Sequence, residues 1–473
     1  MRRNFFFLFI VMFLPGGILP GQSFLAQMIP ADPFLSRFIQ KESISGDEFA
    51  AGQFLLEHCQ QFGLYTERLG NPDSAFNFAA SLYPLSSNKP NIVLLNHLDV
   101  VPITDEKAWK YPAFSGTVSG DTIWGRGAID CKGLAVMQLY ALQQFVRRSK
   151  TENFPYNVTM LSVSGEETGN PFGAAHLVET ELKKLNPVVV FGEGGSGLRN
   201  LVPSRPELPV FGISVAEKSS LWLKLVARKK THGHGAVPPD LYANKRLVKA
   251  LIKILDQKRE VKFNRTSRQM FRTLGKLEGG LKGFVIKHIN WIIFWPFVKK
   301  YFRPGEIFQV LVSNTFVITD INTMNGGSAN QISDEAYAVL DCRLLPGEKS
   351  KRFIRKLRIT TGQKVEIRTL SESPNTPGSP ITPYFEMMQE ALESTYPGSV
   401  SSPILFPAST DNNFFRRKGI PTYGIIPAIF DQEALGGVHG ANEYLLREQL
   451  FKGIDTYWNF IQKCMQQKAV PTN

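Results

Sequence analysis

Two histidines and several carboxylates stand where apolar stretches of this sequence give way abruptly to polar residues. Imidazole nitrogen and carboxylate oxygen are ligands that suit borderline-soft divalent ions such as zinc. Two such ions about 3.5–4 Å apart can hold a nucleophilic water and polarise a carbonyl together. The candidate ligands are His97, Asp130, Glu167, Glu193 and His439. Their joint presence predicts a two-metal hydrolytic site.

Each candidate also has an ordinary structural explanation when it is considered alone. His97 and Asp99 alternate as on an extended segment, so Asp99 either holds the second ring nitrogen of His97 or both residues end a surface strand. Asp130 precedes a helical stretch and is either a metal ligand or a helix N-cap. Glu166 and Glu167 are harder to explain without a cation, because adjacent carboxylates repel each other. The order of all these residues together favours the metal site.

Short apolar runs that end at these polar residues predict the sheet that positions them. The runs 91–95, 158–163 and 187–191 each stop just before a candidate site residue, and residues 133–145 between the first two have helical character. Strands that alternate with helices are typical of an α/β domain with a mixed, mostly parallel sheet and helices on both faces. Ligands bind at the carboxyl ends of such strands.

The pattern of the sequence changes near residue 213 and changes back near residue 377. Between these points, residues 221–226 and 336–345 are typical of strands and residues 244–257 of a helix. We therefore expect a smaller α+β domain inserted into the first domain. The expected division is 1–25 as a separate N-terminal segment, 26–215 and 373–473 as the two parts of the catalytic domain, and 216–372 as the insert.

Residues 284–302 of the expected insert are rich in Trp and Phe and are flanked by lysines. One interpretation is a helix hairpin packed on the insert. The other is an interfacial segment that contacts a membrane surface or a lipid, since aromatic side chains with basic flanks suit such a surface.

The N-terminus has the pattern of a signal peptide. Arg2 and Arg3 precede the apolar run 5–14, which is followed by Pro15 and Gly16. This pattern predicts a secreted or periplasmic protein. An uncleaved membrane anchor and a buried core helix are the alternatives.

The composition is that of a globular chain long enough for two domains, with 473 residues, of which 43% are hydrophobic and 20% charged. The net charge of +13 is spread along the chain without a nucleic-acid-binding motif, so we expect no nucleic-acid partner. The four cysteines have neither metal-ligand nor redox spacing and do not identify the compartment.

The motifs of residues 30–465 resemble, in order and spacing, those of the M20 metallopeptidase family, which includes carboxypeptidases, deacylases and aminoacylases. The matching segments are His97-x-Asp99-Val100-Val101-Pro102, Gly125-x-Gly127-x-x-Asp130-x-Lys132-Gly133, Gly165-Glu166-Glu167, Cys342-Arg343-Leu344-Leu345-Pro346-Gly347 and Val438-His439-Gly440-Ala441-Asn442-Glu443. Two departures stand out. Gly235-Ala236 occupies a place where the family often has two serines, and Gly192 stands where an Asp often precedes the equivalent of Glu193.

The resemblance implies two Zn²⁺ ions, with Co²⁺ or Mn²⁺ as alternatives, bound by the five candidate ligands with Asp130 shared. It also implies that Asp99 orients His97, that Glu166 is the general base, that His234 stabilises the oxyanion, and that Asn330 and Arg343 bind substrate. The insert would be a lid or dimerisation domain, and the protein a homodimer.

The implied function is hydrolysis of the amide next to a C-terminal amino acid, in a small peptide or an N-acyl amino acid. The aromatic segment and the apolar N-terminus resemble the carboxypeptidase S branch, which includes enzymes that hydrolyse or form N-fatty-acyl amino acids. That activity is one alternative for this chain. A catalytically inactive binding relative is a second alternative, and an interfacial lipid-binding protein is a third.

Overall fold

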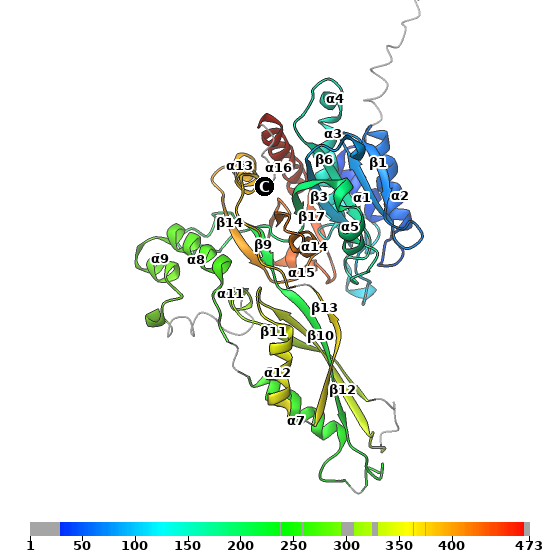
Figure 1. Ribbon diagram of the computed structural model, residues 1–473, viewed down its shortest axis with the longest axis vertical. Coiled ribbons are helices and arrows are strands. Elements are labelled where there is room, and N and C mark those ends of the chain that lie inside the picture. The colour runs from blue at the N-terminus through cyan, green and yellow to red at the C-terminus, as the bar shows by residue number, and fades with distance from the viewer. Residues whose placement is uncertain are drawn as a thin grey trace, which may run out of the picture.

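The computed structural model describes residues 29–236, 238–257, 260–294, 307–323, 330–362, 364–373 and 375–467, without the side chains of residues 292 and 307. Figure 1 shows two sheets at opposite ends of an elongated molecule. The segment 1–25, with its expected signal peptide, lies outside the described residues. Within the described part of the chain, no helix is long and apolar enough to cross a membrane.

The larger sheet has ten strands in the order β1-β2-β6-β3-β7-β15-β9-β8-β16, with β14 paired to β9. Its central strands β6, β3, β7 and β15 are parallel, and antiparallel pairs lie on both sides of them. The strands are β1 Tyr65–Leu69, β2 Asn77–Ser81, β3 Asn91–His97, β6 Asn157–Val163, β7 Pro187–Gly192, β8 Gly197–Leu198, β9 Val210–Glu217, β14 Val400–Phe406, β15 Thr422–Gly424 and β16 Ile429–Phe430. The predicted mixed, mostly parallel α/β sheet is confirmed.

Helices cover both faces of this sheet, as its continuous apolar strands require. In β3, Ile92 and Leu94 belong to one buried cluster, whereas Val93 and Leu95 belong to another on the opposite face. The first face carries α1 Ala31–Ile39, α2 Phe49–Gln61, α3 Lys132–Gln143, α13 Pro383–Thr395 and α16 Arg447–Gln466. The second carries α5 Ala174–Thr180, α6 Leu182–Leu185 and α14 Asn412–Arg417.

The smaller sheet is antiparallel, with the order β11-β12-β10-β13. Its strands are β10 Ser219–Arg228, β11 Thr315–Thr323, β12 Glu335–Leu344 and β13 Val365–Glu372. Burial alternates along β12, so one face of the sheet packs against α7 Ala243–Leu255 and α12 Ser350–Thr361 while the other stays open. β9 leads directly into β10, which connects the two sheets.

A third sheet of only three short strands brings distant parts of the chain together. It consists of β4 Val118–Ser119, β5 Thr122–Trp124 and β17 Tyr444–Leu446, in the order β17-β5-β4. The pairing of Trp124 with Tyr444 places the loop after β5 against the loop before β17. These two loops contain Asp130 and His439.

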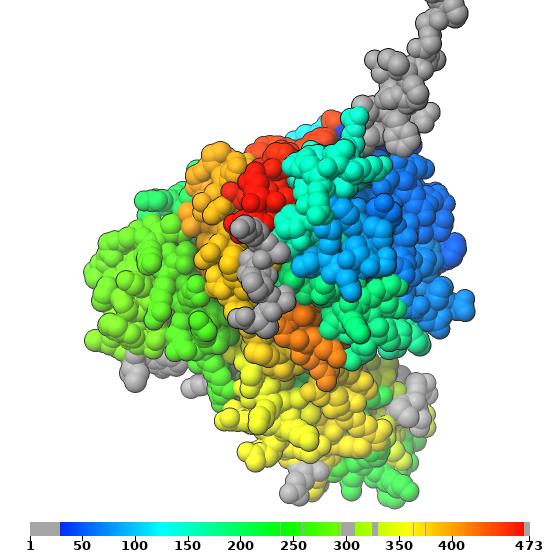
Figure 2. Space-filling view, turned by 45° about the horizontal axis from the view of Figure 1, so that its top comes forward, coloured from blue at the N-terminus to red at the C-terminus, as the bar shows by residue number. Residues whose placement is uncertain are grey.

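The segment 284–302 is described only to residue 294. Its beginning belongs to α9 Gly280–Lys287, which packs against α8 Arg265–Glu278, and the two form a lobe at one side of the molecule (Figure 2). Ile289 is buried in the core of this lobe, whereas Phe284, Trp291 and Ile293 are exposed. The described part of the segment therefore has both a packed and an exposed apolar side.

Candidate active site

The carboxyl ends of three neighbouring parallel strands carry the polar residues of the site. β3 ends at His97, β6 is followed by Glu166 and Glu167, and β7 is followed by Glu193. Because these strands are parallel and adjacent, their polar extensions meet at one edge of the sheet.

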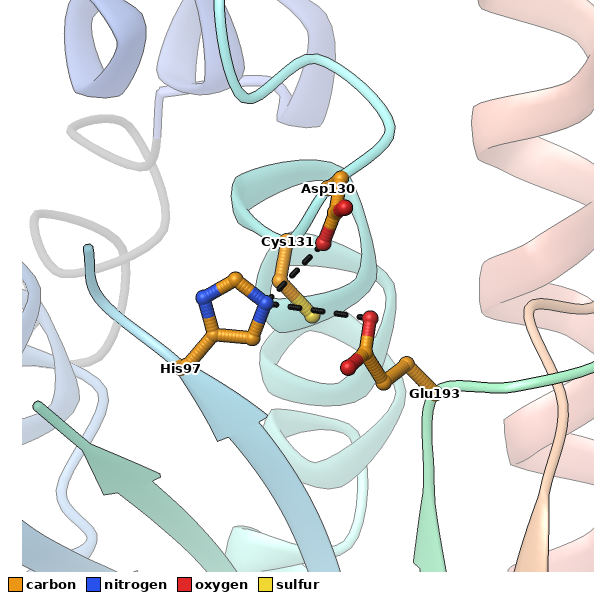
Figure 3. A group of neighbouring side chains, drawn as sticks. All are labelled: His97, Asp130, Cys131 and Glu193. Carbon is orange, nitrogen blue, oxygen red and sulfur yellow. Dashed lines mark hydrogen bonds and ion pairs between the residues drawn. The ribbon is translucent and has the colours of Figure 1, made fainter. Parts of the chain in front are cut away.

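One group of side chains surrounds the imidazole of His97 (Figure 3). Its Nε2 atom lies 2.9 Å from Oδ1 of Asp130 and 3.7 Å from Oε2 of Glu193. One donor atom from each of His97, Asp130, Cys131 and Glu193 lies within 4.8 Å of the others. This spacing is compatible with one shared metal ion after small adjustments.

A second group lies on the other side of Asp130. Nε2 of His439 lies 3.3 Å from Oδ2 of Asp130 and 3.1 Å from Oε2 of Glu167. Asp130 therefore directs one carboxylate oxygen to each group. The structure brings all five predicted ligands together, in two groups that share this residue, and a further group joins the predicted base Glu166 to His97 and Glu167.

The electrostatics of the two groups favour bound cations. Burial, with the neighbouring charge of Asp130, raises the pKa of Glu193 to about 8, and burial with the charge of Glu193 raises the pKa of Glu166 well above its ordinary value. Oε1 of Glu167 is buried without a hydrogen-bond partner. Carboxylates in such a position need positive charge to remain ionised, so the donor set fits a pair of divalent ions.

Gly192, one of the two departures from the family pattern, lies against Asn412. A Cβ atom on Gly192 would lie 2.3 Å from Oδ1 of Asn412, so a side chain at residue 192 would require Asn412 to move. The carboxylate that faces His97 belongs to residue 193, whose backbone carbonyl accepts a hydrogen bond from Asn412.

Asp99 contacts the ring of His97 and the backbone of Glu166 and Glu167. The nearest partner of Nδ1 of His97 is the backbone carbonyl of Asp99, at 2.9 Å, and the Asp99 carboxylate lies at 3.5 Å. That carboxylate accepts hydrogen bonds from the backbone N–H groups of Glu166 and Glu167 and from the hydroxyl of Ser45. Asp99 thus holds the glutamate pair in place in addition to facing His97.

Glu443 holds the loop that carries Asp130. Its buried carboxylate accepts hydrogen bonds from the backbone N–H groups of Gly127, Ile129 and Asp130, and it forms an ion pair of 2.8 Å with Arg126. Sequence reasoning included Glu443 only as part of a matching motif. Its role was missed because its partners are backbone atoms about 315 residues away.

A cavity of about 510 Å³ opens beside the two groups. Of the predicted substrate-binding residues, Arg343 lines it, with its guanidinium 3.0 Å from Asp341. His234 and Asn330 are absent from the described lining; His234 is exposed on a segment that pairs with Gln331. The described residues of the lining are Asp130, Glu166, Glu167, Thr168, Gly169, Glu193, Ser220, Trp222, Arg343, Ser371, Glu372, Ser373, Phe406, Ala408, Ser409, Thr410, Asp411, Asn413, Phe414, Leu435, Val438 and His439.

The sequence model of Peptidase family M20/M25/M40 matches residues 93–463, which include every residue of the two groups. This chain belongs to peptidase family M20. It is therefore a hydrolase of that family. It is 25% identical over 394 residues to the N-fatty-acyl-amino acid synthase/hydrolase PM20D1 of Mus musculus, covering 80% of this chain and 76% of that protein.

Two further M20 comparisons span nearly the whole chain. Aminoacylase-1 of Sus scrofa is 25% identical over 458 residues, covering 92% of this chain and 94% of that protein. The crystal structure of the M20 family metallo-carboxypeptidase Sso-CP2 from Sulfolobus solfataricus superposes with a TM-score of 0.69 at 20% identity, over 93% of this chain and all of that one.

We predict that Glu443→Gln weakens divalent-metal binding by about 10–100-fold, the range seen when outer partners of metal ligands are removed. The amide keeps the shape of the side chain but offers one acceptor oxygen fewer to the loop of Asp130. Zinc affinity is measured by competition with a chelator, and Glu433→Gln, at an exposed position, is the control. An unchanged zinc affinity of Glu443→Gln would show that the loop holds Asp130 without this carboxylate.

Proposed function

We propose that this M20 hydrolase binds two zinc ions and cleaves the amide bond next to a free C-terminal amino acid. The main support for this proposal is the pair of candidate ligand groups that share Asp130, with Glu166 beside them in the same cavity. The names of the relatives support the chemistry, since one is a metallo-carboxypeptidase and another an aminoacylase.

Bound metal ions would polarise the scissile carbonyl and lower the pKa of the attacking water. The chain itself supplies the proton transfer. Glu166 takes a proton from the water as the new C–O bond forms, and it delivers that proton to the leaving nitrogen as the C–N bond breaks. Burial raises the pKa of Glu166, and a carboxyl group with a raised pKa suits a step in which it both accepts and releases a proton.

Recognition of the free carboxylate is assigned to Arg343. Its planar guanidinium suits a carboxylate, and it is the arginine among the described residues of the cavity lining. Phe406, Phe414 and Leu435 form apolar parts of the same lining. These side chains favour an apolar acyl group and support hydrolysis or synthesis of N-fatty-acyl amino acids, the activity in the name of the mouse relative, as the second candidate function.

Substitution Glu166→Gln should lower kcat by about 10²–10⁴-fold, the range typical of a general acid–base group. Zinc content should remain at two ions per chain, because the two groups that share Asp130 are intact. Hydrolysis and bound zinc are measured on the same preparation, with the exposed Glu57→Gln as control. Full activity of Glu166→Gln would remove Glu166 from the mechanism.

Substitution Arg343→Met should lower kcat/KM for substrates with a free carboxylate by about 10–100-fold, because a hydrogen bond to a charged group contributes about 1.5–3 kcal/mol. Dipeptides, N-acetyl amino acids and N-oleoyl amino acids are compared by the amino acid released, with carboxyl-amidated analogues as the control. The substitution should not further impair cleavage of the amidated analogues. An equal loss on both kinds of substrate contradicts the assignment, and a strong preference for acetyl over oleoyl contradicts the fatty-acyl candidate.

We also propose that the active unit is a homodimer in which His234 reaches the site of the second copy. His234 is exposed and absent from the described lining of its own cavity. The smaller sheet offers an edge strand, β11, with Val317 and Ile321 exposed. Helix α7, which packs on β10 and β12, exposes Val248 and Ile252. Analytical sedimentation should therefore give a dimer. Mixing the His234→Ala and Glu166→Gln variants should restore activity that each variant alone lacks, because one site of a mixed dimer combines an intact Glu166 with an intact His234 from the other copy. A fully active monomer contradicts this proposal.

We further propose that residues 1–25 direct export of the protein and that residues 284–302 contact a membrane surface. The exposed Phe284, Trp291 and Ile293 support the second of these. Sedimentation with anionic vesicles tests it, and no binding to them would remove it.

A further inference from the structure

Cys131 is the one member of the His97 group that sequence reasoning did not include. Its side chain is fully buried, and its sulfur lies within 4.8 Å of a donor atom from each of His97, Asp130 and Glu193. Figure 3 shows the sulfur turned into the space that these three side chains face. In the part of the chain that the structure describes, no other cysteine belongs to a group of this kind.

The neighbours of Cys131 distinguish it from an ordinary buried thiol, which packs as a small apolar group. Three donors from different parts of the chain converge on the same space: His97 from the end of β3, Asp130 from the loop before α3, and Glu193 from the end of β7. A sulfur with an imidazole nitrogen and two carboxylate oxygens makes a four-donor set, and zinc binds such sets tetrahedrally.

We propose that Cys131 is the fourth protein ligand of the ion held by His97, Asp130 and Glu193. The inference rests on the proposed two-metal function and assigns a ligand to one of its two sites. Formation of the sulfur–metal bond releases the thiol proton to solvent.

The two metal positions are then unequal. The His97 group has four protein donors, and the His439 group has three, namely Asp130, Glu167 and His439. A site closed by four protein ligands is typical of structural zinc, whereas a catalytic ion keeps a position open. Each group has one carboxylate besides the shared Asp130, and the His97 group adds the thiolate of Cys131. The ion near His439 therefore retains more net positive charge. We therefore assign substrate polarisation to the His439 side.

The thiol also determines metal selectivity. Thiolate ligands favour zinc, whereas carboxylate-rich sites suit manganese and magnesium. The His97 group should therefore discriminate strongly between zinc and manganese, and the His439 group weakly.

The test replaces both ions with Co²⁺, whose complexes with thiolates absorb strongly in the near ultraviolet by charge transfer from sulfur. The wild-type chain should show this band, Cys131→Ser should lack it, and Cys464→Ala, which removes another fully buried cysteine, should retain it. Cys131→Ser should also bind zinc at least about 10-fold more weakly at one site, because loss of a ligand should cost no less than loss of an outer partner of a ligand. The change for manganese should be much smaller.

A second measurement needs no variant. X-ray absorption at the zinc edge of the wild-type holoenzyme should detect a sulfur neighbour at about 2.3 Å, shared among two zinc ions. An active enzyme with two bound ions, no sulfur neighbour and no cobalt–thiolate band overturns the role of Cys131 and leaves the proposed function intact. A chain that binds no zinc overturns both.

Discussion

The site holds several carboxylates close to one aspartate, and their mutual repulsion is the constraint that the rest of the structure must overcome. Asp130 lies between His97 and His439, and Glu166, Glu167 and Glu193 lie around it, partly or fully shielded from water. Such a group is stable only with compensating positive charge, and the ion pairs that Asp130, Glu167 and Glu193 form in the described part of the chain are with the imidazoles of His97 and His439. Two divalent ions beside the shared aspartate would supply further positive charge and would give a partner to Oε1 of Glu167, which is buried without one.

The rest of the fold holds these groups close despite their repulsion. Asp99 fixes the backbone of Glu166 and Glu167, and Glu443 fixes the backbone of Asp130. Both are buried carboxylates that accept several N–H groups, which stabilises their own charge as well as the loops. The small sheet of β4, β5 and β17 brings Glu443 and His439 to the loop of Asp130 from the far end of the chain.

The strand ends and the polar side chains that follow them could be predicted from the sequence because both signals are local. The apolar runs 91–95, 158–163 and 187–191 correspond to β3, β6 and β7 within two residues, and the order of the motifs indicated the family. The positions of Cys131 and Glu443 could not be predicted, for a physical reason. Cys131 lies beside side chains from other strands, and Glu443 accepts hydrogen bonds from backbone groups that carry no side-chain signature. The two faces of the segment 284–294 also depend on tertiary packing, which left its alternatives open.

If Asp130 is shared by two metal ions, crystals of the zinc-loaded chain measured on both sides of the zinc absorption edge will reveal both ions. Two anomalous peaks should flank the Asp130 carboxylate, one beside His97 and Glu193 and the other beside Glu167 and His439. A single peak, or two peaks of which neither lies against Asp130, would contradict this sharing of Asp130.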